Sequence, residues 1–294
     1  MSAQDCLAID IGGTKIACGV VSPSGDLIYR DSVPTPQGAD QEELFSTLMG
    51  LVEKVVSESG LGVSVCGVGC GGPMEAGGVT VSPLNIEGWR SFPLQQRLAG
   101  ALEIPVAIDN DAKALALGEW WNGAGKEASS FLAMVVSTGI GGGIVLDDHL
   151  LDGQFGNAGH IGHIVVDPNG RRCRCGVIGC LEAQASGTAI QEIAGMPAKD
   201  VDDGMKALAG MFVGRAVASV VTLLDLDLCV VAGSVALGFG YPFFEAAQQE
   251  LNRCTGLSYT KGARIVPAGH GDAGPLVGAA AVGFGLGRLA KAGR

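Results

Sequence analysis

The sequence predicts an α/β fold built from two related halves, and three observations support that prediction. Short strands rich in β-branched residues alternate with helical patterns along the 294 residues. Two glycine-rich hairpin turns, Gly12-Gly13-Thr14 and Thr138-Gly139-Ile140-Gly141-Gly142, lie roughly 125 residues apart. The strand Leu228–Ala232 also ends at a small pair, Gly233-Ser234. Because backbone N–H groups in such turns form concave anion sites, the pattern favours a nucleotide held between the two halves.

The first half is expected to open with a hairpin and to continue with alternating helices and strands. Its expected elements are strands Leu7–Asp10 and Ala17–Val21, helix Gln41–Glu58 closed by Gly60, strands Val63–Gly69 and Val106–Asp109, and a helix from about Ala112 to Trp121. In open α/β sheets, ligands bind outside the carboxyl ends of the strands. Gly72 and the pair Asn110-Asp111 fall at such ends.

The second half repeats the opening hairpin. Strands Ser130–Ser137 and Gly143–Leu146 flank the second glycine turn, and a helix near Met205–Leu224 leads into the strand that ends at Gly233. The uncharged window Ala128–Leu146 approaches the length of a membrane span. Its serines and glycines indicate two strands around a polar turn instead.

Composition restricts the class of protein. With 47% hydrophobic residues and 48 glycines, the chain is expected to be globular and turn-rich, and its length allows two domains. The net charge of −11 argues against nucleic-acid binding, which relies on clustered Lys and Arg. The first residues lack a basic segment followed by an apolar stretch, so no secretory signal and no membrane association are expected. Nine cysteines without export favour the cytoplasm and free or metal-bound thiols.

A histidine and three cysteines follow the second hairpin at metal-ligand spacing. His163, Cys173, Cys175 and Cys180 form a soft donor set that suits tetrahedral Zn²⁺. The alternative is a set of buried or disulfide-bonded cysteines. Arginines and glycines separate these cysteines, unlike the pattern of a core stripe, and four protein ligands would leave no open position for a reacting water. A structural zinc site is therefore predicted.

These motifs together resemble the ROK family of sugar kinases and sugar-responsive repressors. The resemblance spans the chain and includes Asp10-x-Gly12-Gly13-Thr14-Lys15, Pro83-Leu84-Asn85 with Trp89, Asn110-Asp111-Ala112, Ser137-Thr138-Gly139-x-Gly141-Gly142-Gly143, Gly162-His163 with the cysteines, Gly179-Cys180-Leu181-Glu182, Ala185-Ser186 and Ala232-Gly233-Ser234. The first and second glycine motifs resemble the phosphate motifs of the family. The third, at Gly233, resembles its adenosine motif.

The resemblance implies an actin-like ATPase (ribonuclease H-like) fold with two α/β domains around a cleft. It implies a small domain of residues 1–112 rejoined by 275–294, a large domain of 113–274, and a homodimer. The implied reaction transfers the γ-phosphoryl group of ATP, with Mg²⁺, to the C6 hydroxyl of a hexose or N-acetylhexosamine. The implied ATP-binding and Mg²⁺-binding residues are Asp10, Gly12, Gly13, Thr14, Lys15, Thr138, Gly139, Gly141, Gly233 and Ser234.

Asp111 is the candidate catalytic residue, because phosphoryl transfer needs an oriented acceptor for the proton of the attacking hydroxyl. The alternative is that Asp111 only caps the helix that follows, a common position for Asp. Asn110 or Asp109 could provide that cap equally well. Asp10, at a strand end beside the first turn, would orient Mg²⁺ and its waters, or would hydrogen-bond its own turn.

The expected sugar-binding residues are Gly72, Asn85, Asn110, Asp111, His160, His163 and Glu182. If one ring nitrogen of His163 binds zinc, the other must carry hydrogen and becomes a fixed donor for a sugar hydroxyl. Glu182 follows a zinc ligand by two residues and could accept from sugar hydroxyls. A solvated surface carboxylate is the alternative for Glu182.

One position departs from the glucokinase pattern of the family. Its glucokinases have Glu where this chain has His160, whereas Ala-Gly-His-Ile-Gly-His at 158–163 is similar to the bacterial N-acetylmannosamine kinases of the family. An imidazole N–H could satisfy an acetamido carbonyl that a carboxylate would repel. N-acetylmannosamine is therefore the expected substrate. The alternative is glucose, with His160 only supporting the zinc loop.

Other classes of protein fit the sequence less well. A repressor of this family would need an N-terminal DNA-binding domain, and the first phosphate turn begins by Asp10. A chaperone or filament-forming ATPase would not explain the His and Cys cluster beside Glu182. Polyphosphate remains an alternative donor, although an acidic chain is a poor host for a long polyanion.

Overall fold

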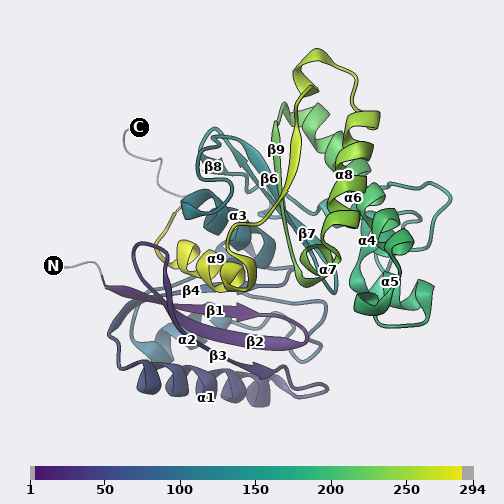
Figure 1. Ribbon diagram of the computed structural model, residues 1–294. Helices are drawn as coiled ribbons and strands as arrows, with labels where there is room; N and C mark the ends of the chain where they lie inside the picture. Colours follow the sequence, from purple (N-terminus) through teal and green to yellow (C-terminus); the bar gives the residue numbers. More distant parts are fainter. Residues whose placement is uncertain (1–3, 287–294) are drawn as a thin grey trace. The chain divides into compact units, whose positions relative to one another are not determined.

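The structure is a computed structural model that describes residues 4–286 in two compact units. Residues Gly123–Leu151 and Gly159–Gly271 form the second unit, and the other described residues form the first. The expected small domain includes 287–294, which lie outside the described residues, as do 1–3. That expected domain ends at residue 112, whereas the first unit continues to Asn122 and includes Asp152–Ala158. Each unit holds one five-stranded sheet with helices, so the predicted α/β class is confirmed (Figure 1).

The first unit has a mixed sheet in the order β3-β2-β1-β4-β5. Its elements are β1 (Asp5–Ile11), β2 (Lys15–Val21), β3 (Leu27–Pro34), α1 (Gln41–Ser59), β4 (Val63–Cys70), η1 (Ala76–Gly78), α2 (Leu94–Leu102), β5 (Val106–Asn110), α3 (Asp111–Asn122), η5 (Gly271–Ala273, at the boundary) and α9 (Gly274–Gly283). β1 pairs antiparallel with β2 and parallel with β4, which pairs parallel with β5. The carboxyl ends of β1, β4 and β5 therefore meet at one edge of the sheet.

Alternate residues of β1 send their side chains into two different cores. Leu7 and Ile9 pack with α1, and Ala8 packs with α9, so helices cover both faces of the sheet (Figure 1). The helix α1 begins where the Asp40 carboxylate accepts hydrogen bonds from the N–H groups of Glu42 and Glu43. It ends at Gly60, whose φ of 63° suits glycine.

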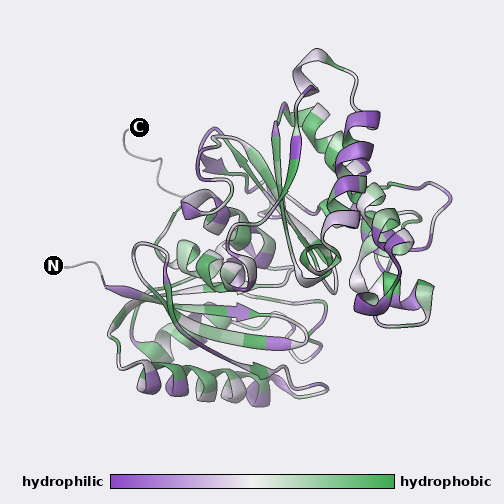
Figure 2. Ribbon diagram, in the orientation of Figure 1, coloured by the Kyte–Doolittle hydropathy of each residue, from purple (hydrophilic) through white to green (hydrophobic). Residues whose placement is uncertain are grey.

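The helix α9 lies between the first sheet and α3, and it is apolar along its length (Figure 2). Glycine makes its close approach to β4 possible. A Cβ added to Gly67 would lie 1.9 Å from the Ala279 carbonyl oxygen and 2.6 Å from the Gly283 nitrogen. The helix can therefore pack on β4 only where that strand lacks a side chain.

The second unit has a sheet in the order β10-β9-β6-β7-β8. Its elements are β6 (Phe131–Val136), β7 (Ile140–Leu146), β8 (His149–Leu150), η2 (Ile161–His163), α4 (Leu181–Ala185), α5 (Gly187–Ala194), η3 (Ala198–Asp200), α6 (Asp203–Leu224), β9 (Leu228–Ala232), α7 (Ser234–Phe239), α8 (Tyr241–Cys254), η4 (Ser258–Thr260) and β10 (Arg264–Pro267). β6 pairs antiparallel with β7 and parallel with β9. The ends of β6 and β9 therefore lie side by side.

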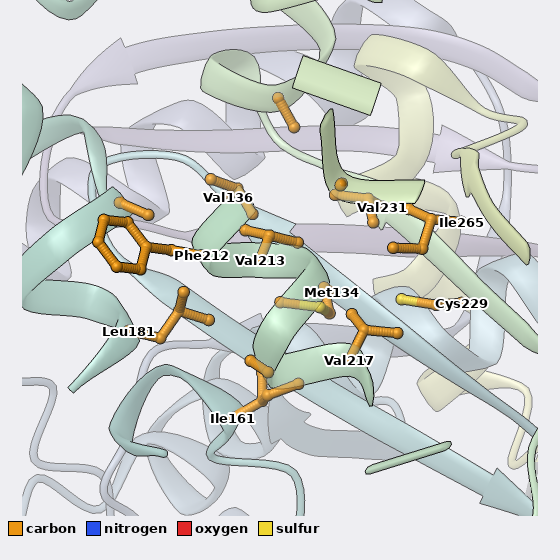
Figure 3. Close-up of a cluster of buried hydrophobic side chains, with 14 of the residues drawn as sticks. Met134, Val136, Ile161, Leu181, Phe212, Val213, Val217, Cys229, Val231 and Ile265 are labelled. Carbon is orange, nitrogen blue, oxygen red and sulfur yellow. The ribbon is translucent and has the colours of Figure 1, made fainter. Parts of the chain in front are cut away.

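The core of the second unit forms between its sheet and α6. Met134, Val213 and Val217 belong to this buried cluster, and Figure 3 shows them with side chains from the sheet and from Leu181. α6 has the length and hydropathy of a membrane span, but 56% of its apolar window is buried inside the unit. That degree of burial is typical of a core helix, since α6 also packs along α8.

The predicted hairpins and the main helices are confirmed, whereas several shorter elements escaped prediction. The predicted helix near Met205–Leu224 matches α6, and the window Ala128–Leu146 holds all of β6 and β7. The strands β3, β8 and β10 and the helices α2, α4, α5, α7 and α8 were not among the expected elements. β3 is an edge strand whose alternating exposure gives a weaker apolar signal than β1.

Gly67→Ala should lower the free energy of unfolding by about 3 kcal/mol, because its methyl group overlaps the α9 main chain. Urea unfolding measures the change. Gly50→Ala is the matched control: Gly50 lies in α1 with no atom within 4 Å of an added Cβ. That substitution should raise stability by about 0.5–1 kcal/mol. Equal effects of the two substitutions would contradict the proposed packing of α9.

Candidate functional site

The first glycine turn joins β1 to β2, and hydrogen bonds to its main chain hold it in place. The Gly12 N–H donates to the Lys15 carbonyl at 3.0 Å. The Thr35 hydroxyl donates to the Gly12 carbonyl at 2.7 Å, and the Gln37 side-chain amide donates to the Gly13 carbonyl at 2.9 Å. Sequence reasoning missed Thr35 and Gln37, because residues that bind carbonyls of a distant turn leave no periodic pattern.

Two aspartates, Asp10 and Asp111, lie beside Gly69 at the edge of the first sheet. Gly69 of β4 is paired with Asp10 of β1 and with Asp109 of β5. A Cβ at Gly69 would lie 3.7 Å from Asp10 Oδ1 and 3.6 Å from the Asp111 Cα. Burial raises the pKa of the Asp10 carboxyl to about 7, with the Asp111 carboxylate adding to the rise and Lys15 opposing it.

Asp111 is the first residue of α3, and its side chain is exposed. Its Oδ1 accepts from the Ala112 N–H at 2.8 Å, and Asn110 Oδ1 accepts from the same N–H at 3.1 Å. Asn110 precedes the helix and accepts from the N–H two residues on, which is the position of a helix cap, whereas the Asp111 contact is with the next residue only. Losing the acid function of Asp111 would thus leave the helix start with a cap.

The other expected residues of the first unit lie beside these groups. A Cβ at Gly13 would lie 2.5 Å from the Asn85 Cβ, so the loop at Asn85 packs directly on the turn. A Cβ at Gly72 would lie 3.5 Å from Asn110 Nδ2. The residues that meet at this edge are Asp10, Gly12, Gly13, Thr14, Lys15, Gly72, Asn85, Asn110 and Asp111.

The second glycine turn, Ser137–Gly139, joins β6 to β7 in the second unit. The Ser137 hydroxyl lies 3.1 Å from the Ser234 hydroxyl at the start of α7. Gly233 has a φ of 100°, and a Cβ there would lie 2.3 Å from the Val136 carbonyl oxygen. Because β6 pairs with both β7 and β9, the ends of these strands are neighbours. They carry Thr138, Gly139, Gly141, Gly233 and Ser234.

His163, Cys173, Cys175 and Cys180 come together in the second unit as a group that could hold a metal ion. Their ligand atoms all lie within 4.8 Å of one another. His163 Nδ1 lies 3.6 Å from Cys173 Sγ, and Cys175 Sγ lies 3.6 Å from Cys180 Sγ. No disulfide joins these cysteines, which are free thiols. Burial raises the pKa of the Cys180 thiol to about 12, so a cation is needed to favour its thiolate.

The ring nitrogen of His163 that lies beside the Cys173 thiol is Nδ1. His160 is exposed, and its ring centroid lies 6.2 Å from that of His163. The loop that carries both histidines packs on β7 through glycine. A Cβ at Gly162 would lie 2.2 Å from the Ile140 carbonyl oxygen.

An ion pair between half-buried Arg215 and buried Glu250 anchors the loop after His163 to the helices of the second unit. Arg215 of α6 donates to the Val166 carbonyl at 2.8 Å and to Glu250 Oε1 of α8 at 3.0 Å. Hydrogen bonds from Arg253 and Arg215 lower the pKa of Glu250 to about 2. Sequence reasoning missed this pair, although an arginine inside the apolar run of α6 was an available signal.

The chain belongs to the ROK family, since the model of that family matches residues 6–283. An N-acetylmannosamine kinase of Yersinia pseudotuberculosis serotype O:1b (strain IP 31758) is 36% identical over 251 residues, which cover 80% of this chain and 84% of the relative. By this relationship the chain is a ROK family sugar kinase.

Solved structures of ROK proteins have the same fold as this chain. The ROK family glucokinase from Streptomyces griseus, in complex with glucose and AMPPNP, matches with a TM-score of 0.85 at 28% identity, over 96% of this chain and 99% of that one. The ROK hexokinase from Thermus thermophilus matches with a TM-score of 0.78 at 33% identity, over 95% and 98% of the two chains. The expected actin-like ATPase fold is thereby confirmed.

Metal analysis of the purified protein should find about one bound metal ion per chain, because four ligands complete a tetrahedral site. Cys175→Ser should lose the ion. Cys254→Ser is the matched control, because Cys254 is also exposed but lies in α8, outside the four-residue group. A metal-free wild-type protein, or a Cys175→Ser variant with full metal content, would show that the group does not bind metal.

Proposed function

We propose that this chain is an ATP-dependent kinase that phosphorylates the C6 hydroxyl of an N-acetylhexosamine, with N-acetylmannosamine as the preferred sugar. The observation that carries the proposal is the pair of carboxylates, Asp10 and Asp111, beside the first glycine turn. A phosphoryl-transfer site needs a proton acceptor, a group that orients a cation and backbone N–H groups for phosphates. The carboxyl edge of the first sheet carries a candidate for each of these three groups.

Asp111 is the proposed acceptor of the sugar hydroxyl's proton. Its exposed position at the start of α3 leaves the carboxylate open to a substrate. In a loose transition state the hydroxyl loses its proton late, so an ordinary carboxylate is basic enough if it is well oriented. The hydrogen bond from the Ala112 N–H to Oδ1 supplies that orientation.

Asp10 is the proposed residue that orients Mg²⁺. A carboxyl whose pKa is raised by burial and by a neighbouring carboxylate gains most from a nearby cation. Bound Mg²⁺ would neutralise charge on the transferred phosphoryl group. The turns at Gly12–Lys15 and Thr138–Gly141 would bind the phosphates through N–H groups, and Gly233-Ser234 would contact the adenosine.

Zinc is the metal that best fits the group of one histidine and three cysteines. A tetrahedron with Zn–S bonds of about 2.3 Å has edges of about 3.8 Å, close to the observed 3.6 Å between Cys175 Sγ and Cys180 Sγ. Bound zinc would fix the loop and supply no reacting water. The histidine would bind through Nδ1, leaving Nε2–H as the donor to a sugar hydroxyl.

The residues proposed to bind the sugar are Gly72, Asn85, Asn110, Asp111, His160, His163 and Glu182. His160 supports an acetylated sugar, because its N–H can donate to the acetamido carbonyl. The 36% identical N-acetylmannosamine kinase supports the same choice. Glucose is the second candidate, supported by the glucose complex of the Streptomyces griseus glucokinase.

Asp111→Asn should lower kcat by about 100-fold or more while sugar and ATP still bind. The amide keeps an oxygen for the Ala112 N–H and loses the basic carboxylate. Steady-state kinetics and calorimetric binding of each substrate separate the two effects. Near-normal kcat in this variant would make Asp111 a helix cap alone.

His160→Glu should move the ratio of kcat/KM for N-acetylmannosamine over glucose toward glucose by about 1–3 kcal/mol, the effect of one polar contact. The wild type should favour the acetylated sugar. The measurement is kcat/KM for both sugars in both proteins. A wild type that prefers glucose, with a ratio that the substitution leaves unchanged, would remove His160 from the sugar site and support the glucokinase alternative.

A further inference from the structure

The segment that follows the metal ligand Cys180 is bonded to the second glycine turn at several points. Glu182 Oε2, at the start of α4, accepts from the Ile140 N–H at 2.9 Å. The Gly187 N–H donates to the Ser137 carbonyl at 2.7 Å. The Thr188 hydroxyl donates to the Thr138 carbonyl at 3.0 Å. Residues 182–188 therefore hold both ends of the turn through its main chain.

Glycines allow this approach on both sides. A Cβ at Gly139 would lie 2.9 Å from Glu182 Oε2, and a Cβ at Gly187 would lie 2.9 Å from the Ser137 carbonyl oxygen. Such distances are closer than ordinary side-chain contacts permit. The turn and the segment 182–188 are consequently packed main chain against main chain, and the Glu182 carboxylate lies directly on the turn.

We propose that Glu182 is a positioning residue for the nucleotide: its carboxylate fixes the Ser137–Gly139 turn in the shape that binds phosphate. The inference rests on the proposed function, which assigns this turn to ATP, and it adds a role for Glu182 that does not depend on the sugar. A turn that already has its binding shape binds the nucleotide more tightly, because no conformational entropy is lost in ordering the turn when the ligand binds. Losing the hydrogen bond to Ile140 would leave the turn to be ordered when the nucleotide binds.

The negative charge of Glu182 would by itself have the opposite effect on nucleotide binding. A carboxylate beside a phosphate-binding turn repels the polyphosphate, so removing Glu182 would tighten nucleotide binding if repulsion dominated. The turn's backbone, however, is held by a hydrogen bond to a charged acceptor, which is stronger than one between neutral groups. Positioning therefore outweighs repulsion, and the two effects predict changes of opposite sign.

The test is calorimetric binding of AMPPNP with Mg²⁺ and without sugar, so that no sugar contact of Glu182 contributes. Glu182→Ala should weaken binding by about 10- to 100-fold, the effect of one lost hydrogen bond to a charged group. Glu182→Gln keeps an acceptor oxygen for the Ile140 N–H and should stay within about 3-fold of the wild type. Thr188→Val removes the second side-chain contact and should weaken binding by about 2- to 5-fold.

Gln191→Ala is the matched control, because Gln191 is an exposed residue of the same helix, α5, and lies outside the segment 182–188 that contacts the turn. It should bind AMPPNP as the wild type does. Metal content is measured in every variant and should equal that of the wild type, which separates positioning from loss of the metal-binding loop. In kinetics, Glu182→Gln should change the KM for sugar more than the KM for ATP.

Unchanged or tighter AMPPNP binding by Glu182→Ala would overturn the inference and leave the proposed kinase function intact. Equal losses in Glu182→Ala and Glu182→Gln would also overturn it, because the carbonyl acceptor alone should hold the turn. A wild type that binds no AMPPNP would instead overturn the assignment of the turn to ATP, and with it this inference.

Discussion

The proposed chemistry depends on one electrostatic constraint, the placement of the Asp10 and Asp111 carboxylates beside the same strand end. Gly69 of β4 lies beside both residues: a Cβ there would lie 3.7 Å from Asp10 Oδ1 and 3.6 Å from the Asp111 Cα. Burial and mutual repulsion raise the pKa of Asp10 to about 7, and Lys15 only partly compensates. Such a pair is poorly stable without a cation and is well suited to hold one during phosphoryl transfer.

The second unit contains polar loops that a hydrophobic core cannot order, and other interactions hold them in place. A metal ion bound by His163 and the three cysteines would fix the loop that carries His160, and Arg215 with Glu250 anchors that loop to α6 and α8. From Cys180 the chain passes directly into the segment that holds the Ser137–Gly139 turn. One short stretch thus connects the metal site with the turn proposed to bind phosphate.

The sequence predicted those parts of the molecule that carry a local signal. β-Branched runs predicted β1, β2, β6 and β9, and the soft donor set predicted which four residues meet as a metal-binding group. It did not predict β3 or α8, whose polar faces weaken the apolar pattern. The contacts of Glu182 with Ile140 and of Thr35 with Gly12 could not be predicted, because each joins a side chain to main chain from a distant segment. Only the three-dimensional fold brings such partners together.

The most direct test of this account is an ADP-release assay of the wild-type protein with ATP, Mg²⁺ and each of glucose, mannose, N-acetylglucosamine and N-acetylmannosamine. The account predicts that ADP forms only when a sugar is present and that kcat/KM is highest for N-acetylmannosamine. If kcat/KM were highest for glucose, glucose would be the preferred substrate and the proposed kinase mechanism would still hold. ADP formation that does not depend on sugar, or none with any of the four, would contradict the proposed function.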